Sequence, residues 1–359
     1  MNSRERLERC YRQQEIDRPA VYTRTAYPLN DPTYDELKKF MQMYTDHKKA
    51  WTGWRIDYAY KLEKMVKPYS SDYQRVITTM TTPKGKLTSS LFSNLTGKPN
   101  MLETHYIKDY DDALKYLSLP DADIIPGNPS DFFEEIKNMG DKGIIEVHLG
   151  LNPAGFVADL MGSENFAIMS ITDRDIIYEL CKKRMHTLIR AVKKLVENGI
   201  GPYFSMLGEE YIVPPMHGEK DFYDFNVQYD KPIIDLIHNA GGYVHIHCHG
   251  SIKKVLQGFV DMGADVLHPF EAPPMGDITA SEAKKIIRNK ICMEGNIQIS
   301  HMYESTPDEI REEVTNLIHD AFDDGKGLIV CPTASPYIFG EGEKCFQQYK
   351  ALVETVVNR

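Results

Sequence analysis

The chain has 359 residues, of which 42% are hydrophobic and 26% are charged, a composition typical of a globular protein with a sizeable core. Its 42 Lys and Arg residues against 52 Asp and Glu residues give a formal net charge of −10, which argues against nucleic acid or an anionic membrane as a partner. No apolar run approaches the roughly 20 residues that cross a bilayer. The polar N-terminus MNSRERLERC and six scattered cysteines without a CxxC pair lead us to expect a cytoplasmic protein.

In chain order, the first expected strand is AVYTRT, residues 20–25. The segment RVITTMTTPKGKLTSSLF, residues 75–92, holds two β-branched runs around a Pro-Lys-Gly turn and predicts a hairpin. At least one further strand is expected within residues 50–130.

From residue 143 onward, short apolar runs alternate with amphipathic helical segments, which predicts a parallel sheet with right-handed crossovers. The six runs are residues 143–150, 201–210, 241–250, 263–272, 290–297 and 327–335. Together with the earlier strands they favour a (β/α)8 TIM barrel with N-terminal helical and hairpin elaborations, forming a single domain over residues 1–359. A doubly wound open sheet is the alternative, but it lacks support because no GxGxxG follows a first strand.

Polar side chains gather at the ends of these runs, where the active site of a TIM barrel lies. They are Glu146, His148, Glu209, Glu210, His245, His247, His249, His268, Glu271, Glu294, Asn296 and Cys331. One barrel mouth would receive most of them.

The stretch GGYVHIHCHG, residues 241–250, has the highest density of possible metal ligands. Side chains alternate along a strand, so His247 and His249 share one face and can lean onto one ion, whereas Cys248 points the other way. Cys331, which ends the run GLIVC, is the best third ligand, and Glu271 could add an oxygen. Two nitrogens, one sulfur and an open or carboxylate-filled position are typical of a catalytic zinc site.

The remaining polar residues have less specific roles. A substrate-binding role is expected for His148, His245 and Asn296, and a catalytic role for Glu210 and Glu271. A lone strand histidine is more often a satisfied polar group than a ligand, and His245, deeper in its strand, fits a supporting or core position. Glu210 and His148 could equally lie on the surface.

Several segments resemble the uroporphyrinogen decarboxylase superfamily, and within it the zinc-dependent corrinoid methyltransferases. They are SRERLERCYRQQEIDRPAVY, GADVLHPFEAPPMGD, MEGNIQ and IVCPTAS. The resemblance implies that the family's zinc-binding His-x-Cys-Gly falls on residues 247–250, that its distant cysteine is Cys331, and that Glu271 is an exchangeable ligand. It also implies a corrinoid cofactor supplied by a corrinoid-binding partner protein.

Two departures from the family bear on the reaction. His249 stands where the family has cysteine, and the arginine-rich segment of the decarboxylases is replaced by TRTAYPLND, with only Arg24. Porphyrinogen decarboxylation is therefore not expected. Two imidazoles and one thiolate leave Zn²⁺ a stronger Lewis acid than one imidazole and two thiolates, which suits an oxygen leaving group.

The favoured function is therefore O-demethylation: a methyl group passes from a small methoxylated compound to the corrinoid, and Glu210 protonates the departing oxygen. Methyl transfer from a corrinoid to a thiol is an alternative. A decarboxylase-like lyase, a metal-dependent hydrolase and a non-catalytic binding protein are the others.

Overall fold

The computed structural model describes residues 1–96 and 99–358. Within them, eight parallel strands form one sheet in the order β1-β14-β13-β12-β11-β10-β9-β2. From β2 to β14, each barrel strand therefore pairs with the barrel strand that comes next in the chain, and β14 pairs with β1. The strands are β1 (Ala20–Val21), β2 (His47–Trp51), β9 (Gly143–Leu151), β10 (Tyr203–Leu207), β11 (Tyr243–His247), β12 (Val266–His268), β13 (Cys292–Ile297) and β14 (Leu328–Pro332). The Asp46 amide donates to the Val21 carbonyl at 2.8 Å, which brings the two edge strands together. The predicted TIM barrel is confirmed.

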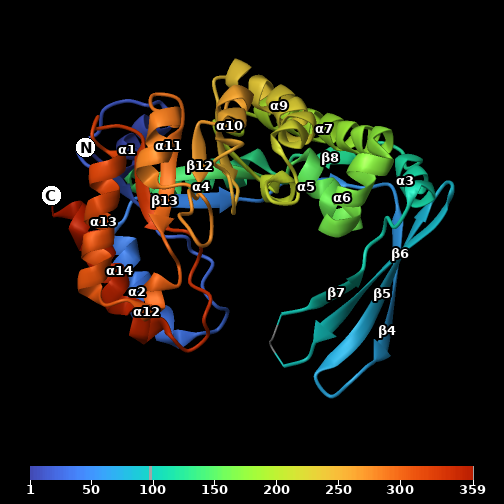
Figure 1. Cartoon of the computed structure of the whole chain (residues 1–359), viewed down its shortest axis with the longest axis horizontal. Helices are drawn as coiled ribbons and strands as arrows, with labels where there is room; N and C mark the ends of the chain where they lie inside the picture. The colour runs from blue at the N-terminus through green and yellow to red at the C-terminus, as the bar shows by residue number, and fades with distance from the viewer. Residues whose placement is uncertain (97–98, 359) are drawn as a thin grey trace.

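Helices follow the barrel strands and cover the outside of the sheet (Figure 1). They are α2 (Asp35–Tyr44), α4 (Pro129–Met139), α5 (Pro153–Met161), α6 (Ser163–Thr172), α7 (Arg174–Glu197), α9 (Gln228–Asn239), α10 (Leu256–Met262), α11 (Ala280–Ile287), α12 (His301–Glu304), α13 (Pro307–Ala321) and α14 (Gly342–Val357). Short turns are η1 (Pro32–Tyr34), η2 (Gly140–Lys142), η3 (Glu209–Ile212), α8 (Glu219–Asp221) and the π-helical η4 (Phe222–Val227). Helix α13 begins with a capping box between Thr306 and Glu309.

The strand that the sequence left unassigned is β2, which begins before the range 50–130 in which it was expected. Its sequence, HKKAW, lacks an apolar alternation because Lys48 points into the barrel, where it is 4% exposed and paired with carboxylates. A buried charge on the inner face removes the period-2 signal on which strand prediction depends.

Helix α1 (Ser3–Tyr11) closes the amino-terminal end of the barrel. Its residues Leu7, Cys10 and Tyr11 form one buried cluster with side chains from six barrel strands, among them Ile144 and Ile329. This plug leaves the carboxyl ends of the strands as the open end of the barrel.

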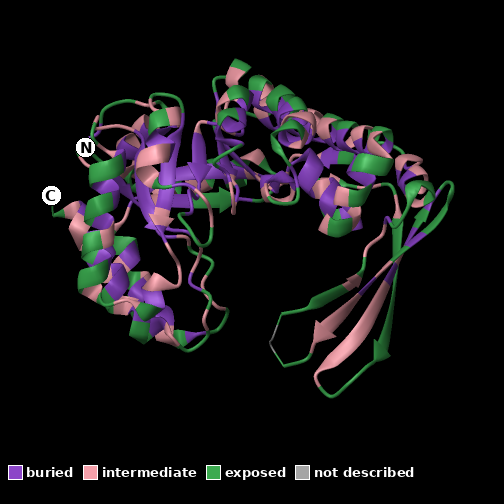
Figure 2. Ribbon diagram, in the orientation of Figure 1, coloured by how far each residue is buried: buried purple, intermediate pink, exposed green. Residues whose placement is uncertain are grey.

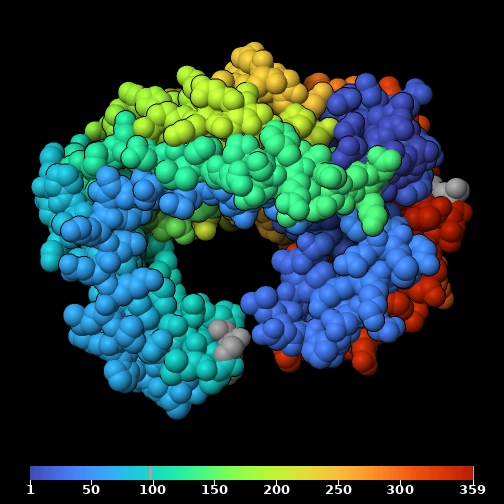
Figure 3. All heavy atoms as spheres, turned by 180° about the vertical axis from the view of Figure 1, so that it is seen from behind, coloured from blue at the N-terminus to red at the C-terminus, as the bar shows by residue number. Residues whose placement is uncertain are grey.

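A four-stranded antiparallel sheet projects from the barrel between β2 and β9, and we call it the arm, residues 61–104 (Figure 1). It consists of β4 (Lys61–Pro68), β5 (Tyr73–Thr82), β6 (Gly85–Asn94) and β7 (Met101–Thr104), and β5 with β6 is the predicted hairpin. The pair β3 (Arg55–Asp57) and β8 (Asp123–Ile125) and helix α3 (Tyr110–Leu117) lie at its base. Figure 3 shows an opening between the arm and the blue N-terminal segment. Among the described residues, no helix is long and apolar enough to cross a membrane.

Candidate metal centre

Three potential ligands from three neighbouring strands meet inside the open end of the barrel. His268 ends β12, Glu294 lies on β13 and Cys331 lies on β14, and their ligand atoms are all within 4.8 Å of one another. All three residues are at most 1% exposed. Imidazole, carboxylate and thiolate all bind metal ions in proteins, so this cluster is a candidate metal site.

His247 joins this cluster through His268. The Nδ1 atoms of the two rings are 2.8 Å apart, and Arg24 Nη1 lies 3.3 Å from His247 Nδ1 and 3.0 Å from His268 Nδ1. The Nε2 atom of His268 lies 3.1 Å from the Pro332 carbonyl oxygen, to which it donates. That hydrogen bond fixes the proton on Nε2 and leaves the Nδ1 lone pair directed toward His247 and Arg24.

Both imidazoles are held in the neutral form, which is the form that binds metals. Burial, followed by the positive charge of Arg24, lowers the pKa of His247 to about 2. The same two causes lower the pKa of His268 well below its ordinary value. Burial raises the pKa of the Cys331 thiol, so that a nearby cation is needed to favour the thiolate.

His249 lies beside this cluster and is paired with Glu271. Its Nδ1 is 3.1 Å from Glu271 Oε2, which also accepts a hydrogen bond from the Gly250 amide at 3.1 Å. Burial opposes ionisation of Glu271, but these two hydrogen bonds outweigh it and lower the pKa of the carboxyl. An ionised Glu271 is therefore oriented toward His249 at the rim of the site.

A buried ionic network lies beneath the cluster. Lys48 Nζ forms an ion pair with Glu294 and lies 3.2 Å from Glu146 Oε1, while the Tyr11 hydroxyl donates to Glu146. His245 Nε2 is 3.6 Å from the other oxygen of Glu294. Burial raises the pKa of Glu294, but Lys48 and His245 outweigh it and hold the pKa well below its usual range. Glu294 is thus a carboxylate already shared among several partners.

The structure places the other predicted site residues as follows. His148 Nδ1 is 3.2 Å from the Ser205 hydroxyl, and burial lowers the pKa of His148. The side chain of Asn296 is hydrogen-bonded to the Phe270 backbone, because its Oδ1 accepts from the Phe270 amide at 3.0 Å. Glu210 Oε2 accepts from the Gly208 amide at 3.1 Å, and burial raises the pKa of its carboxyl.

Cys248, as expected from strand alternation, belongs to the hydrophobic core around the barrel rather than to the ligand cluster. Sequence reasoning did not assign ligand roles to His268 and Glu294, and it gave no role in the metal site to Lys48 or Arg24. His268 and Glu294 were recognised only as polar residues at strand ends. Their convergence with Cys331 depends on the order of strands β12, β13 and β14 in the barrel.

The fold is similar to that of a methyltransferase of known structure. A methyltransferase from Methanosarcina mazei has a structure that matches 99% of this chain and 98% of its own, with a TM-score of 0.62 at 13% sequence identity. A B12-independent methionine synthase from Shewanella sp. W3-18-1 matches 85% of this chain and 76% of its own, with a lower TM-score of 0.46 at 11% identity. No curated protein sequence matches the chain.

The family model described as uroporphyrinogen decarboxylase (URO-D) matches residues 152–337, more than half of the chain. The matched region contains β10 to β14 and therefore every ligand of the cluster. The chain belongs to the uroporphyrinogen decarboxylase (URO-D) family.

Proposed function

We propose that this chain is a zinc-dependent methyltransferase that moves a methyl group from a small methoxylated substrate to a corrinoid carried by a partner protein. The observation that carries the proposal is the buried cluster of His268, Glu294 and Cys331 at the mouth of the barrel, with His247 joined to it through His268. The fold shared with a methyltransferase of Methanosarcina mazei supports it.

The residues present fit a divalent cation. His268 and Cys331 would hold it together with His247, which adjoins His268, and Glu294 would supply negative charge beside it. In this proposed ligand set His268 takes the place that the sequence assigned to His249. The charges of the surrounding groups also fit, because one divalent ion with Lys48 and Arg24 would balance four anions. These anions are Glu146, Glu294, Glu271 and the Cys331 thiolate.

When bound, Zn²⁺ would supply a Lewis acid that stabilises negative charge on the oxygen of a methyl ether. The chain's own residues would do the rest. Glu210 is the proposed proton donor to the departing oxygen, because burial raises the pKa of its carboxyl and favours the protonated acid. Glu271, fixed by His249 and the Gly250 amide, would orient the substrate at the rim.

The sparse positive charge at the mouth argues against decarboxylation of a substrate with many carboxylates. Arg24 is directed at the two imidazoles, and Lys48 is paired with Glu146 and Glu294 beneath them. Neither cation is free to bind a further carboxylate. A methoxylated substrate of low charge suits this environment better.

The test is the spectroscopic conversion of cob(I)alamin to methylcobalamin by the zinc-loaded protein, across methoxylated, methylthiol and methylamine donors. We expect conversion with a methoxylated donor, loss of it in Cys331→Ser, and retention in Cys248→Ser, which changes an equally buried thiol outside the cluster. Stoichiometric zinc without methyl transfer from any donor would overturn the proposal. Methylation of a thiol by methylcobalamin would instead support the alternative direction of transfer.

A further inference from the structure

The arm has a bare apolar row on one face. Val66, Val76, Leu91 and Leu102 are paired side by side across all four strands, and the end residues Val66 and Leu102 are 54% and 52% exposed. Figure 2 shows that buried residues are found mainly where the arm joins the rest of the chain. The row is therefore an unusual apolar surface for a sheet that projects from its domain.

The same face is covered nearer the barrel. Met80 and Leu87 lie four residues from Val76 and Leu91 along β5 and β6, so they point to the same side, and they are 2% and 1% exposed. They pack in one cluster with Ala113 of α3 and with side chains of α5. The sheet face thus continues beyond the helices that bury its base.

The arm is also basic in an otherwise acidic chain. Residues 61–104 contain seven Lys and Arg residues and three Asp and Glu residues, a net charge of +4, whereas the whole chain carries −10. Five of its lysines have no carboxylate within 4.0 Å among residues 1–96 and 99–358, and they are Lys61, Lys64, Lys67, Lys84 and Lys86. Lys61, Lys64, Lys67 and Pro68 lie on the edge strand β4, where they discourage strand-to-strand pairing. A partner would therefore dock on the face of the arm.

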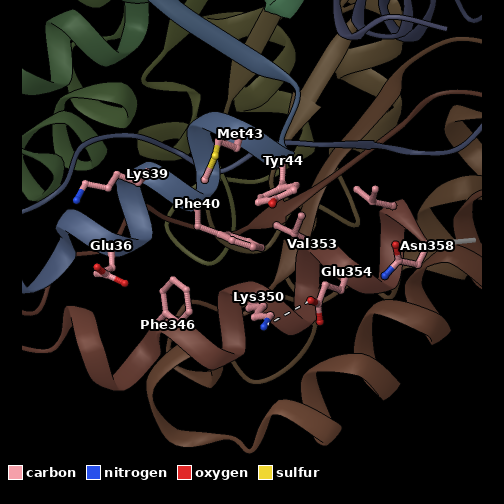
Figure 4. A pocket seen from close by; sticks show the side chains of 11 residues that line it. Glu36, Lys39, Phe40, Met43, Tyr44, Phe346, Lys350, Val353, Glu354 and Asn358 are labelled. Atoms are coloured by element: carbon pink, nitrogen blue, oxygen red, sulfur yellow. Dashed lines mark ion pairs between the residues drawn. The ribbon is translucent and has the colours of Figure 1, made fainter.

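The chain itself carries an apolar groove next to an acidic helix. Residues 301–359 contain eleven acidic and five basic residues, a net charge of −6. Helix α14 from this segment and helix α2 enclose a groove of about 500 Å³. Figure 4 shows the rings of Phe40, Tyr44 and Phe346 between the two helices, and Tyr44 is 51% exposed. The groove lining itself carries no net charge, because Lys39 and Lys350 balance Glu36 and Glu354. The net acidic charge lies mainly on helix α13, which packs against α14 and carries five carboxylates against the single Arg311.

We infer that the arm of one chain docks on the α2–α14 groove of a second copy of this chain. The apolar row would cover exposed Tyr44 and the half-buried rings of Phe40 and Phe346, and the unpaired lysines would face the acidic helix α13. Among the described residues, no hydrogen bond or ion pair joins the arm to this segment within one chain. Because every chain has one arm and one groove, a two-fold pair would form this contact twice.

A second copy fits better than a flat anionic surface. Outside the arm the chain carries −14, so a membrane or a nucleic acid that attracted the arm would repel the body beside it. A second copy presents its acidic segment together with an apolar groove, and both features of the arm are then matched.

The first experiment measures the molar mass of the full-length protein by analytical ultracentrifugation across concentration and salt. We expect a dimer that is weakened at least about tenfold in Lys61→Glu/Lys64→Glu/Lys67→Glu. The control Lys137→Glu/Lys142→Glu/Lys193→Glu changes three exposed lysines outside the arm and should leave the dimer intact. A monomer at all concentrations up to roughly 100 μM would overturn the inference, as would binding of the monomer to vesicles of anionic lipid.

The second experiment identifies the contact. A chain with Leu102→Cys is mixed with a differently tagged chain with Tyr44→Cys and oxidised mildly; the six native cysteines are all buried and should not react. We expect disulfide-linked heterodimers from the mixture and little linkage from either variant alone. Linkage of Leu102→Cys to itself, or none in the mixture, would contradict docking in the groove. Neither measurement requires zinc or methyl transfer, so its outcome is separate from that of the proposed function.

Discussion

The Nδ1 atoms of His247 and His268 lie 2.8 Å apart at the ends of β11 and β12. Since the proton of His268 is on Nε2, the two nitrogens can approach this closely only with positive charge or a proton between or beside them. The guanidinium of Arg24 supplies such a charge. The relationship explains why this part of the barrel is suited to a cation.

The zinc affinities of two variants should show whether His268 or His249 is a metal ligand. His268→Gln should weaken zinc binding by about 100-fold or more, because it removes a ligand whose lone pair is already directed toward His247. His249→Gln should weaken it by less than about tenfold, because the His249 ring is engaged by Glu271. Competition with a chromogenic chelator measures both affinities. The reverse order of effects would restore the ligand set predicted from the sequence.

The second prediction concerns Arg24. Arg24→Met should tighten zinc binding by about tenfold or more, because a positive charge no longer lies against two ligand nitrogens. It should also lower the stability of the zinc-free protein by about 1–3 kcal/mol, since the ring nitrogens of buried His268 and half-buried His247 lose the guanidinium beside them. Chelator competition and urea unfolding give the two values. The charge-preserving Arg24→Lys should show a smaller gain in affinity, and equal gains in both variants would argue against an electrostatic effect.

The third prediction tests the network under the site. Lys48→Met should destabilise the protein by about 3–5 kcal/mol, because it leaves Glu146 and Glu294 as buried carboxylates without their cation. The adjacent Lys49 is exposed and pairs with Glu135, so Lys49→Met should cost less than about 1 kcal/mol. Urea unfolding at neutral pH provides the comparison. Equal losses in the two variants would show that the network does not stabilise the barrel.

The fourth prediction is a dependence of stability on pH that arises from Glu209 and Asp230. Burial raises the pKa of Asp230 to about 8, and burial together with Asp230 raises the pKa of Glu209 well above its ordinary value. The folded state then holds protons that the unfolded state releases near pH 4. The stabilisation is therefore complete below about pH 4 and is lost as the pH rises through about 8.

Between pH 5 and 8 the free energy of unfolding should fall by up to about 1.4 kcal/mol per pH unit for each proton involved. Glu209→Gln or Asp230→Asn should flatten this decline, whereas Glu63→Gln, at an exposed position on the arm, should not. Urea unfolding at several pH values tests the slope. A decline in Glu209→Gln as steep as in the unaltered chain would rule out this carboxyl pair as its source.

Most of the barrel could be predicted from the sequence because its strands are apolar runs separated by amphipathic helices. The exception, β2, was missed because Lys48 replaces an inward apolar residue. The strand-end clustering of polar residues likewise identified the mouth of the barrel. These are local patterns, and they can be recognised in the sequence without knowledge of the fold.

The grouping of ligands within the mouth was harder to predict. Cys331 meets His268 and Glu294 because β12, β13 and β14 lie side by side in the sheet, although His268 and Cys331 are more than 60 residues apart in the chain. The role of Arg24 depends on a side-chain direction that no spacing rule gives. Ligands that lie on one strand can be predicted from their spacing in the sequence. Ligands that come from different strands can be predicted only when the order and register of the barrel strands are known.

The most direct test of the metal centre is zinc K-edge X-ray absorption of the purified, zinc-loaded protein. One sulfur at about 2.3 Å together with imidazole nitrogens at about 2.0–2.1 Å is the predicted coordination, and the sulfur contribution should disappear in Cys331→Ser but not in Cys248→Ser. A first shell without sulfur, or one with two sulfurs, would contradict the proposed ligand set of His247, His268 and Cys331.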